Sequence, residues 1–254
     1  MRRAFVIVIA ATVVALFAAL PLRAQDGEPD HTPDSIFMVG ALTDTGSSAL
    51  LGKDKILPFP IIFYHNKYMT LETTNLYVHP VDTGPFQISA IGSMRVSNIE
   101  MSSDDRLKDF DRNLAFEVGG RASFSLSDFS LYGQYLTDVT DAHGGEEITI
   151  GLTWEKQLDS LRLSIDGGAR HRSSELSTYL FGVTTDDSAS GYSPHALKAD
   201  WYPFAEARAS YPLTGRWGLV LTGTAEHLPE TALLSPIVEK RNNLKAGLGI
   251  TYTF

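Results

Sequence analysis

The strongest constraint on the fold is a strict alternation of apolar and polar positions at the end of the chain. The apolar side chains there are those of Leu244, Ala246, Leu248, Ile250, Tyr252 and Phe254, and the residues between them are polar or glycine. Successive side chains of a β-strand point to opposite faces. The segment therefore predicts a strand with one apolar face and one polar or small face.

The same alternation recurs along the chain in segments of about ten residues, which is the length of a membrane-crossing β-strand. A soluble β-sandwich also alternates, so the pattern alone does not select a membrane protein. Three further features do. The polar faces combine charges of both signs with Gly and Ser, aromatic residues lie near the strand ends, and the chain stops on an aromatic residue within a strand. Together they predict an all-β fold, an antiparallel transmembrane β-barrel.

The connections between these segments alternate in length. Residues 80–85, 126–128, 156–160 and 212–215 are short, 140–145 is intermediate, and 98–112, 173–198 and 228–241 are long. Outer-membrane barrels have short periplasmic turns and longer outer loops, and an even number of strands. Counting back from Phe254 predicts ten strands, with twelve as the alternative. Residues 36–43 are left over. They form either an additional strand with a return crossing or a segment at the periplasmic mouth or in the lumen.

Aromatic residues gather at one end of the predicted barrel if Phe254 lies at the periplasmic end. They predict an aromatic girdle made of Phe86, Phe124, Phe129, Trp154, Tyr211 and Trp217. The terminal residues Ile250, Tyr252 and Phe254 resemble the C-terminal signal that barrel proteins present to the insertion machinery. We therefore expect the last strand both to direct assembly and to close the barrel.

Charged residues on the polar faces are expected to point into the lumen. They are Arg95, Arg121, Arg162, Arg170, Arg208 and Lys245, together with Glu72, Glu117, Asp138, Glu147, Glu155, Asp166, Glu206 and Glu226. A wide pore selective for one ion sign would show a ring of one charge, whereas this set is nearly balanced. The balance favours groups that pair across a filled interior, with a narrow channel as the alternative.

The N-terminus has the features of a secretory signal peptide at residues 1–24: Arg2 and Arg3, an apolar run, and Ala24 before Gln25. A membrane anchor is the alternative, but Pro21 and the polar run after Ala24 favour cleavage. Residues 25–35 are expected to be a flexible periplasmic leader and residues 36–254 the barrel. No later stretch is long and apolar enough for a membrane helix.

Composition excludes several classes of function. The chain has 21 Lys and Arg against 30 Asp and Glu, which disfavours nucleic-acid binding, and its lack of Cys excludes disulfides and thiol catalysis. Residues 191–195, with the sequence Gly-Tyr-Ser-Pro-His, do not form a nucleophile elbow. His143 and His195 have acidic neighbours in sequence, but no set of nucleophile, base and orienting group is recognisable. We expect no enzyme activity, no metal and no cofactor.

Several segments resemble the MipA/OmpV family of outer-membrane proteins. They are residues 57–64 (LPFPIIFY), 179–183 (YLFGV), 235–243 (SPIVEKRNN) and 246–254 (AGLGITYTF). The resemblance covers the chain from about Ile36 onward. The family's usual glycine-rich first strand is reduced here to residues 37–42, FMVGAL.

The resemblance implies a location in the outer membrane of a Gram-negative bacterium and a structural or scaffolding role. The family is named for an interaction with a murein lytic transglycosylase, so the implied partners are that enzyme and a murein synthase, besides outer-membrane lipid and the insertion machinery. A narrow, porin-like solute channel and a surface adhesin are the alternatives.

Overall fold

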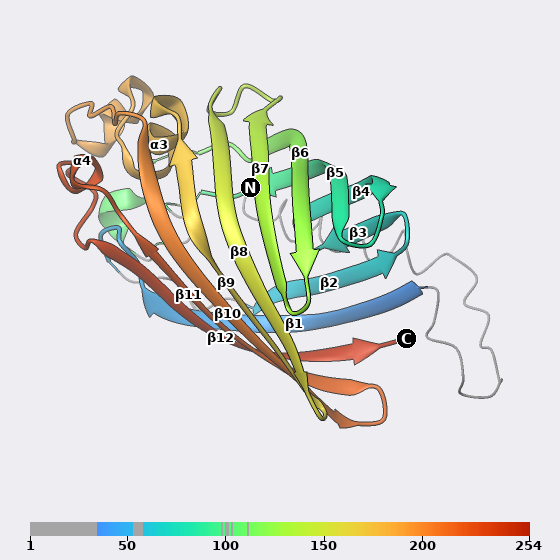
Figure 1. Cartoon of the computed structure of the whole chain (residues 1–254). Coiled ribbons are helices and arrows are strands. Elements are labelled where there is room, and N and C mark those ends of the chain that lie inside the picture. The colour runs from blue at the N-terminus through green and yellow to red at the C-terminus, as the bar shows by residue number, and fades with distance from the viewer. Residues whose placement is uncertain (1–34, 53–57, 98, 100–101, 103, 111) are drawn as a thin grey trace. The chain divides into compact units, whose positions relative to one another are not determined.

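The computed structural model describes residues 35–52, 58–97, 99, 102, 104–110 and 112–254. Together they form a closed antiparallel barrel in which β1 pairs with both β2 and β12 (Figure 1). The strands are β1 (Ser35–Ser47), β2 (Pro58–Asn66), β3 (Met69–Glu72), β4 (Asn75–Asp82), β5 (Phe86–Arg95), β6 (Ala115–Leu126), β7 (Phe129–Asp138), β8 (Glu146–Leu158), β9 (Leu161–Arg172), β10 (Asp200–Thr214), β11 (Trp217–His227) and β12 (Asn242–Thr253).

The barrel has twelve strands in the described residues, so the first prediction of ten is wrong and the alternative is correct. The leftover segment is β1, which supplies the pairing edge that closes the sheet. The second additional strand arises because residues 69–82 turn back at Thr73 and Thr74. Thr73 adopts φ 37° there, and its neighbours include no Gly or Pro that would signal a turn. The predicted signal peptide and almost all of the predicted leader lie outside the described residues.

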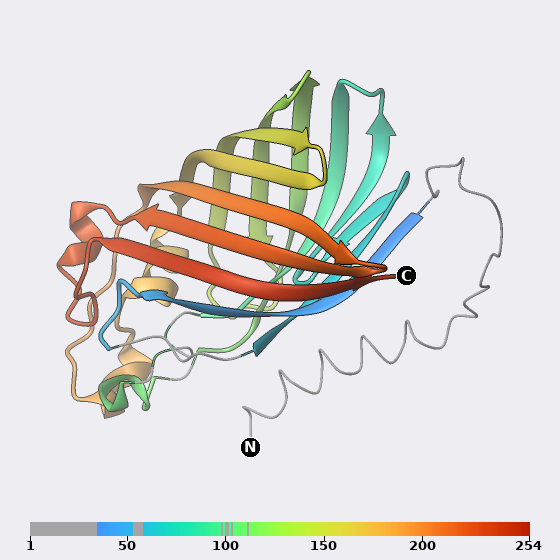
Figure 2. The ribbon, with the colours of Figure 1, turned by 90° about the horizontal axis from the view of Figure 1, so that it is seen from below.

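The two ends of the barrel differ in their connections. The turns at residues 67–68, 83–85, 127–128, 159–160 and 215–216 lie at one end, here called the short-turn end. Most of the long connections lie at the other, the loop end, and Figure 2 shows this separation from a second side. The exception is the short β3–β4 turn, which points toward the loop end. The predicted alternation of short and long connections is otherwise confirmed.

The faces of the wall follow the predicted alternation. On β12, Leu248 and Ile250 are about half exposed, whereas Gly247, Gly249 and Thr251 are buried on the inner side. The outer surface is apolar on other strands too, as Ile150 and Ile165 show. A protein in water would not expose so many large apolar side chains on one continuous surface. No helix in the described part of the chain has the length and hydropathy needed to span a membrane.

The main cluster of buried apolar side chains lies at the loop end. It includes residues from four connections and one strand: Ala49, Leu50, Ile99, Leu107, Phe110, Leu176, Tyr179, Leu180, Phe181, Val183, Leu197, Tyr202, Leu228, Ala232 and Ile237. The loops contain the short helices η1 (Asp105–Leu107), α3 (Ser174–Phe181), η2 (Thr185–Ser190) and α4 (Glu230–Leu233). We call this packed group of loops the cap.

Hydrogen bonds join the cap loops to one another. Leu51 N donates to Ile237 O at 2.9 Å, and Glu239 N donates to Ala49 O at 2.8 Å. The Tyr179 hydroxyl donates to Asn113 O at 2.6 Å. The large apolar side chains of these loops are buried against one another.

Candidate functional site

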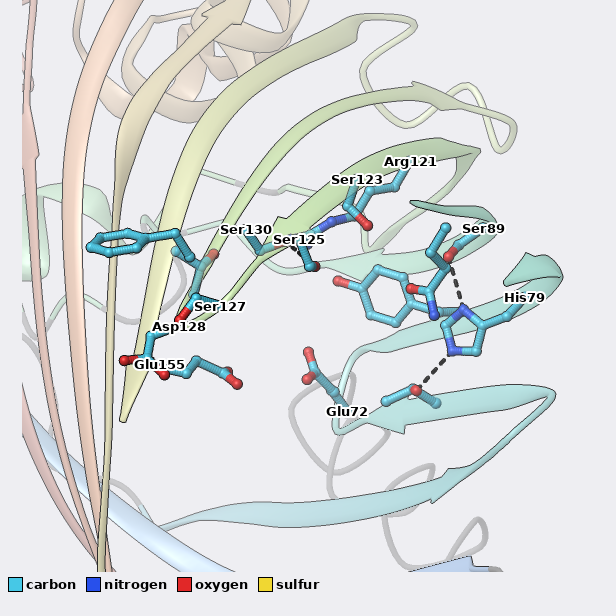
Figure 3. A pocket seen from close by; sticks show the side chains of 15 residues that line it. Glu72, His79, Ser89, Arg121, Ser123, Ser125, Ser127, Asp128, Ser130 and Glu155 are labelled. Carbon is cyan, nitrogen blue, oxygen red and sulfur yellow. Dashed lines mark hydrogen bonds between the residues drawn. The ribbon is translucent and has the colours of Figure 1, made fainter. Parts of the chain in front are cut away.

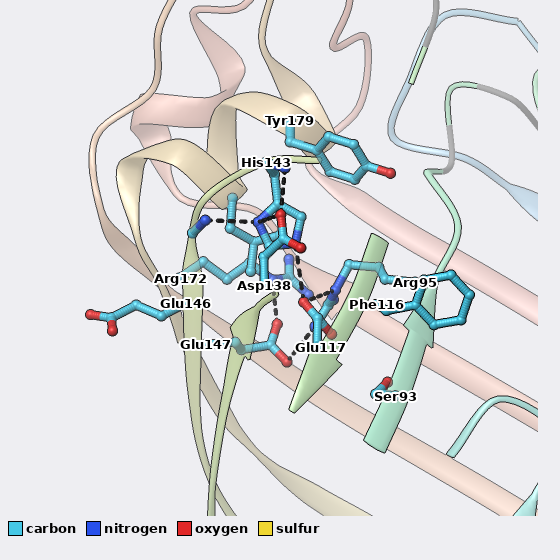
Figure 4. Close-up of polar contacts among 12 residues, drawn as sticks. Ser93, Arg95, Phe116, Glu117, Asp138, His143, Glu146, Glu147, Arg172 and Tyr179 are labelled. Atoms are coloured by element: carbon cyan, nitrogen blue, oxygen red, sulfur yellow. Dashed lines mark hydrogen bonds and ion pairs between the residues drawn. The ribbon is translucent and has the colours of Figure 1, made fainter. Parts of the chain in front are cut away.

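A chain of ion pairs crosses the barrel interior near the loop end (Figure 4). Arg95 of β5 contacts Glu117 of β6 at 2.7 Å and Glu147 of β8 at 3.2 Å. Glu147 also contacts Arg172 of β9 at 2.8 Å. Arg172 then contacts Glu226 of β11 at 2.6 Å. We call this alternating series the ion network.

The ion network branches at both of its ends. Arg170 contacts Glu226 at 3.2 Å and Glu206 of β10 at 2.5 Å. At the other end, the fully buried His143 contacts Glu117 at 3.2 Å. His143 Nδ1 accepts from Gly145 N at 2.9 Å. The proton of a neutral ring must therefore be on Nε2, which donates to Glu117.

The ion network lies directly beneath the cap. The His143 ring is 5.1 Å from the Tyr179 ring, and the Arg172 guanidinium lies 4.5 Å from the centre of the Tyr202 ring. The side chains of Glu117, Glu147 and Arg172 are each at most 6% exposed. Buried charges are tolerated only when they are paired. Each of these buried charges therefore needs a partner of opposite charge from another strand.

The cap contains a buried ion pair of its own. Arg112 binds Asp187 through both carboxylate oxygens, at 2.6 and 2.7 Å, and also donates to Gly182 O. Burial alone would raise the pKa of Asp187, but hydrogen bonds from Arg112 and Thr184 outweigh it and lower that pKa below its ordinary value. The ionised pair therefore fastens residues 184–187 to the β5–β6 connection.

A second layer of polar and aromatic side chains fills the interior nearer the short-turn end. The Arg121 guanidinium lies 3.7 Å from the centre of the Tyr132 ring, and the Tyr132 hydroxyl donates to Asp166 at 2.8 Å. Gly151 leaves the space that Tyr132 occupies, because a Cβ there would lie 2.5 Å from the ring. Thr153 also donates to Asp166, at 3.3 Å.

The short-turn half of the interior contains a polar cavity of about 480 Å³ (Figure 3). It reaches the β6–β7 turn at Ser127 and Asp128. Its lining residues are Thr70, Glu72, Tyr77, His79, Gln87, Ser89, Arg121, Ser123, Ser125, Ser127, Asp128, Phe129, Ser130, Thr153 and Glu155. Hydroxyl groups are the commonest feature of this lining. We call it the lumen cavity.

The structure separates the predicted lumen charges into groups. Six belong to the ion network: Arg95, Glu117, Glu147, Arg170, Glu206 and Glu226. Glu72, Arg121 and Glu155 line the cavity, Asp166 accepts a hydrogen bond from Tyr132, and Asp138 accepts one from His143 N. Arg162 donates to Gln157 at 3.4 Å, Arg208 is exposed, and Lys245 is half-buried. The network thus uses only part of the predicted set.

The predicted set included Glu147 but missed Arg172 and His143, which also belong to the ion network. Arg172 could have been found, because it has the same strand phase as Arg170. His143 lies in the β7–β8 connection. Strand alternation gives no signal for a loop residue.

The predicted girdle residues are placed at the short-turn end. Phe86 pairs with Phe124, and Phe129 pairs with Trp154. All six girdle residues are exposed except Trp154, which is half-buried, and Phe129 also borders the lumen cavity. Ile250 is exposed on the outer face of β12.

At the C-terminus, three aromatic rings pack in series. The Tyr252 ring lies 5.1 Å from the Trp217 ring and 5.0 Å from the Phe254 ring. Phe254 also stacks on Phe37 of β1 at 5.2 Å, and its backbone N–H donates to Phe37 O at 2.9 Å. The terminal residue therefore contacts the strand that closes the barrel.

The histidines form no metal site in the described residues, where no cluster of three or more ligating side chains is found. His171 packs against Trp201 on the outer wall, with ring centres 5.1 Å apart. His195 pairs with Val183 through backbone hydrogen bonds. His79 contacts Ser89 at 2.8 Å, but its other ring nitrogen contacts Thr70 rather than a carboxylate.

The closed antiparallel wall, its apolar exterior and its polar interior define an outer-membrane β-barrel. The model of the family described as MltA-interacting protein MipA matches residues 39–254. The chain belongs to this family and is an outer-membrane protein. The predicted resemblance and location are confirmed. Because outer-membrane barrels have short periplasmic turns and longer outer loops, we expect the short-turn end to face the periplasm and the cap to face outward.

The known proteins to which this chain is similar include one relative and two solved structures. The protein YiaT of Escherichia coli (strain K12), described as an outer membrane protein, is 21% identical over 247 residues, which cover 95% of this chain and 98% of YiaT. An outer membrane channel from Pseudomonas putida F1 is 13% identical, with a TM-score of 0.43, and the match covers 89% of this chain and 100% of the channel. The N-terminal barrel domain of Pseudomonas aeruginosa OprF is 12% identical, with a TM-score of 0.29, and the match covers 87% of this chain and 98% of that domain.

Proposed function

We propose that this barrel is a non-catalytic, non-conducting platform that holds a murein lytic transglycosylase at the outer membrane. The observation that carries the proposal is the ion network beneath the cap, where charges from six strands pair with one another. An open channel needs those charges to face water. A platform needs only a rigid barrel, and paired interior charges supply that rigidity.

The partner follows from the family description, which names an interaction with MltA. The docking face in this proposal is the periplasmic, short-turn end, because an enzyme that cleaves the murein layer works in the periplasm. The turns there contain only a few residues each. We therefore infer contact with several turns together rather than with one binding loop.

The test is a pull-down of purified MltA-type transglycosylase by the barrel, with an unrelated outer-membrane barrel as the reference. A short peptide inserted between Gly215 and Arg216, at the periplasmic end, should reduce capture. The same insertion at Leu234, which is 73% exposed in the outer β11–β12 connection, should not. Capture that is absent, or equally affected by both insertions, would contradict the platform role.

A narrow solute channel is the competing candidate, and the lumen cavity is the observation that favours it. In that case the cavity would be the periplasmic half of a pathway. Its other half would require the ion network and the cap to separate.

A further inference from the structure

The lumen cavity lies in the barrel interior and reaches the surface proposed to dock an enzyme at Ser127 and Asp128 of the β6–β7 turn. The cavity is enclosed by the barrel wall, with β3–β5 on one side and β6–β8 on the other (Figure 3). The cap and the ion network lie toward the outside of the cell, whereas Ser127 and Asp128 bring the cavity to a periplasmic turn. A ligand would therefore enter from the periplasm.

The size of the cavity suits a small molecule. Its volume of about 480 Å³ falls within the range of roughly 300–1,000 Å³ that is usual for ligand sites. Most such sites are largely apolar, but this one is lined mainly by hydroxyl, carboxylate, amide and imidazole groups. An apolar ligand would leave these groups without hydrogen-bond partners, which is costly.

Other contacts hold several polar groups of the lining in place. His79 lies between Ser89 at 2.8 Å and Thr70 at 2.9 Å. The Thr70 hydroxyl also contacts His65 Nδ1 at 2.9 Å. On the opposite side, Ser125 donates to Ser130 at 3.1 Å. Groups oriented in this way lose little freedom when a ligand binds.

The charges of the lining select against anions. Glu72 and Glu155 have no ion-pair partner among the described residues, whereas Asp128 is paired with Lys156. Arg121, stacked on Tyr132, adds a planar donor. The cavity thus offers carboxylate acceptors, guanidinium donors and hydroxyls that do both. Vicinal hydroxyl groups of a ligand can satisfy all three kinds.

We propose that the lumen cavity binds a small, uncharged saccharide that enters from the periplasm. Its ring hydroxyls would donate to Glu72 and Glu155 and accept from Arg121, and the flanking serines would take either role. The proposal does not depend on enzyme docking, because the site lies within the barrel. A plain sugar and an N-acetylated sugar both carry such ring hydroxyl groups, so the test includes one of each.

The test is isothermal titration calorimetry of the full barrel in a detergent without a sugar headgroup. The probes are cellobiose for the plain sugar, N,N′-diacetylchitobiose for the N-acetylated one, and spermidine as a cationic reference. We expect saturable binding of at least one disaccharide, and the preferred one identifies the source. No saturable disaccharide binding, or tighter binding of spermidine than of either sugar, would overturn the proposal.

Adjacent residues of β6 provide a matched pair of variants. Ser123 lines the cavity, whereas Ala122 is exposed on the opposite face of the strand. Ser123→Phe should weaken disaccharide binding at least about tenfold, or roughly 1.4 kcal/mol, because the ring occupies the cavity. Ala122→Phe should leave it unchanged, and equal effects would overturn the assignment. Folding of both is checked by heat-dependent gel migration.

A milder variant covers the case in which Ser123→Phe fails to fold. Glu155 is exposed near the periplasmic end of β8, so Glu155→Ala should fold. It should weaken disaccharide binding about tenfold by removing charge-assisted hydrogen bonds. Undiminished binding by this variant would overturn the role given to the carboxylate.

Discussion

Glu147 is the residue that joins the two halves of the ion network. Its carboxylate contacts Arg95 on one side and Arg172 on the other, and its side chain is 6% exposed. Each arginine also has a second acidic partner, Glu117 or Glu226. Loss of the charge at Glu147 would therefore leave each arginine with one acidic partner in place of two.

We predict that Glu147→Gln lowers the free energy of unfolding by about 3 kcal/mol, the lower end of the cost of breaking a buried ion pair. Glu206→Gln is the control, because the Glu206 side chain is 42% exposed. This substitution should lower the free energy of unfolding by at most about 1 kcal/mol. Urea unfolding in lipid vesicles, followed by tryptophan fluorescence, measures both. Equal losses would show that burial does not determine the strength of the network.

Asp187 makes the stability of the cap depend on pH. Its pKa is lowered in the folded protein, so its contribution is complete above the ordinary Asp pKa and is lost as pH falls through the lowered value. We predict that Asp187→Asn lowers the melting temperature at neutral pH, and that its difference from wild type shrinks in acid below about pH 4. A difference that stays constant across this range would contradict the assignment.

At the scale of the strand, the alternation in the sequence predicted most of the wall correctly. This succeeded because a two-faced wall between lipid and a polar interior requires that alternation in each strand. The β3–β4 turn was missed because Thr73 and Thr74 carry no turn signal of their own. The cap could not be predicted either, because it depends on contacts such as Arg112 with Asp187, far apart in sequence.

The last strand connects assembly with closure of the barrel. Phe254 contacts Phe37 of β1 and the Tyr252 ring, and β1 is the edge that β12 must find. An unpaired strand edge in lipid leaves backbone groups without partners, at a cost of several kcal/mol each. The insertion of this barrel should therefore depend on its terminal residue.

We predict that deletion of Phe254 slows assembly and leaves the precursor open to proteolysis, whereas Phe254→Tyr assembles like wild type. The tyrosine keeps the aromatic contacts with Phe37 and Tyr252. Pulse-chase labelling with heat-dependent gel migration follows the three chains in parallel. Normal assembly of the deletion variant would show that Phe254 has no special role in assembly.

At the scale of the whole molecule, the barrel interior is divided into two parts. The outward part is filled by the ion network and covered by the cap, and the periplasmic part contains the lumen cavity. The platform role depends on this division. So does the proposal that a saccharide reaches the cavity only from the periplasm. If the outward part opened readily, the protein would be a channel.

Conductance of the purified barrel in planar lipid bilayers tests this division most directly. We predict no steady single-channel current for the wild-type protein in concentrated KCl. The double variant Glu147→Ala with Arg172→Ala, which removes the centre of the ion network, should show more frequent opening if it folds. Stable, ohmic channels in the wild-type protein would contradict a closed outward half.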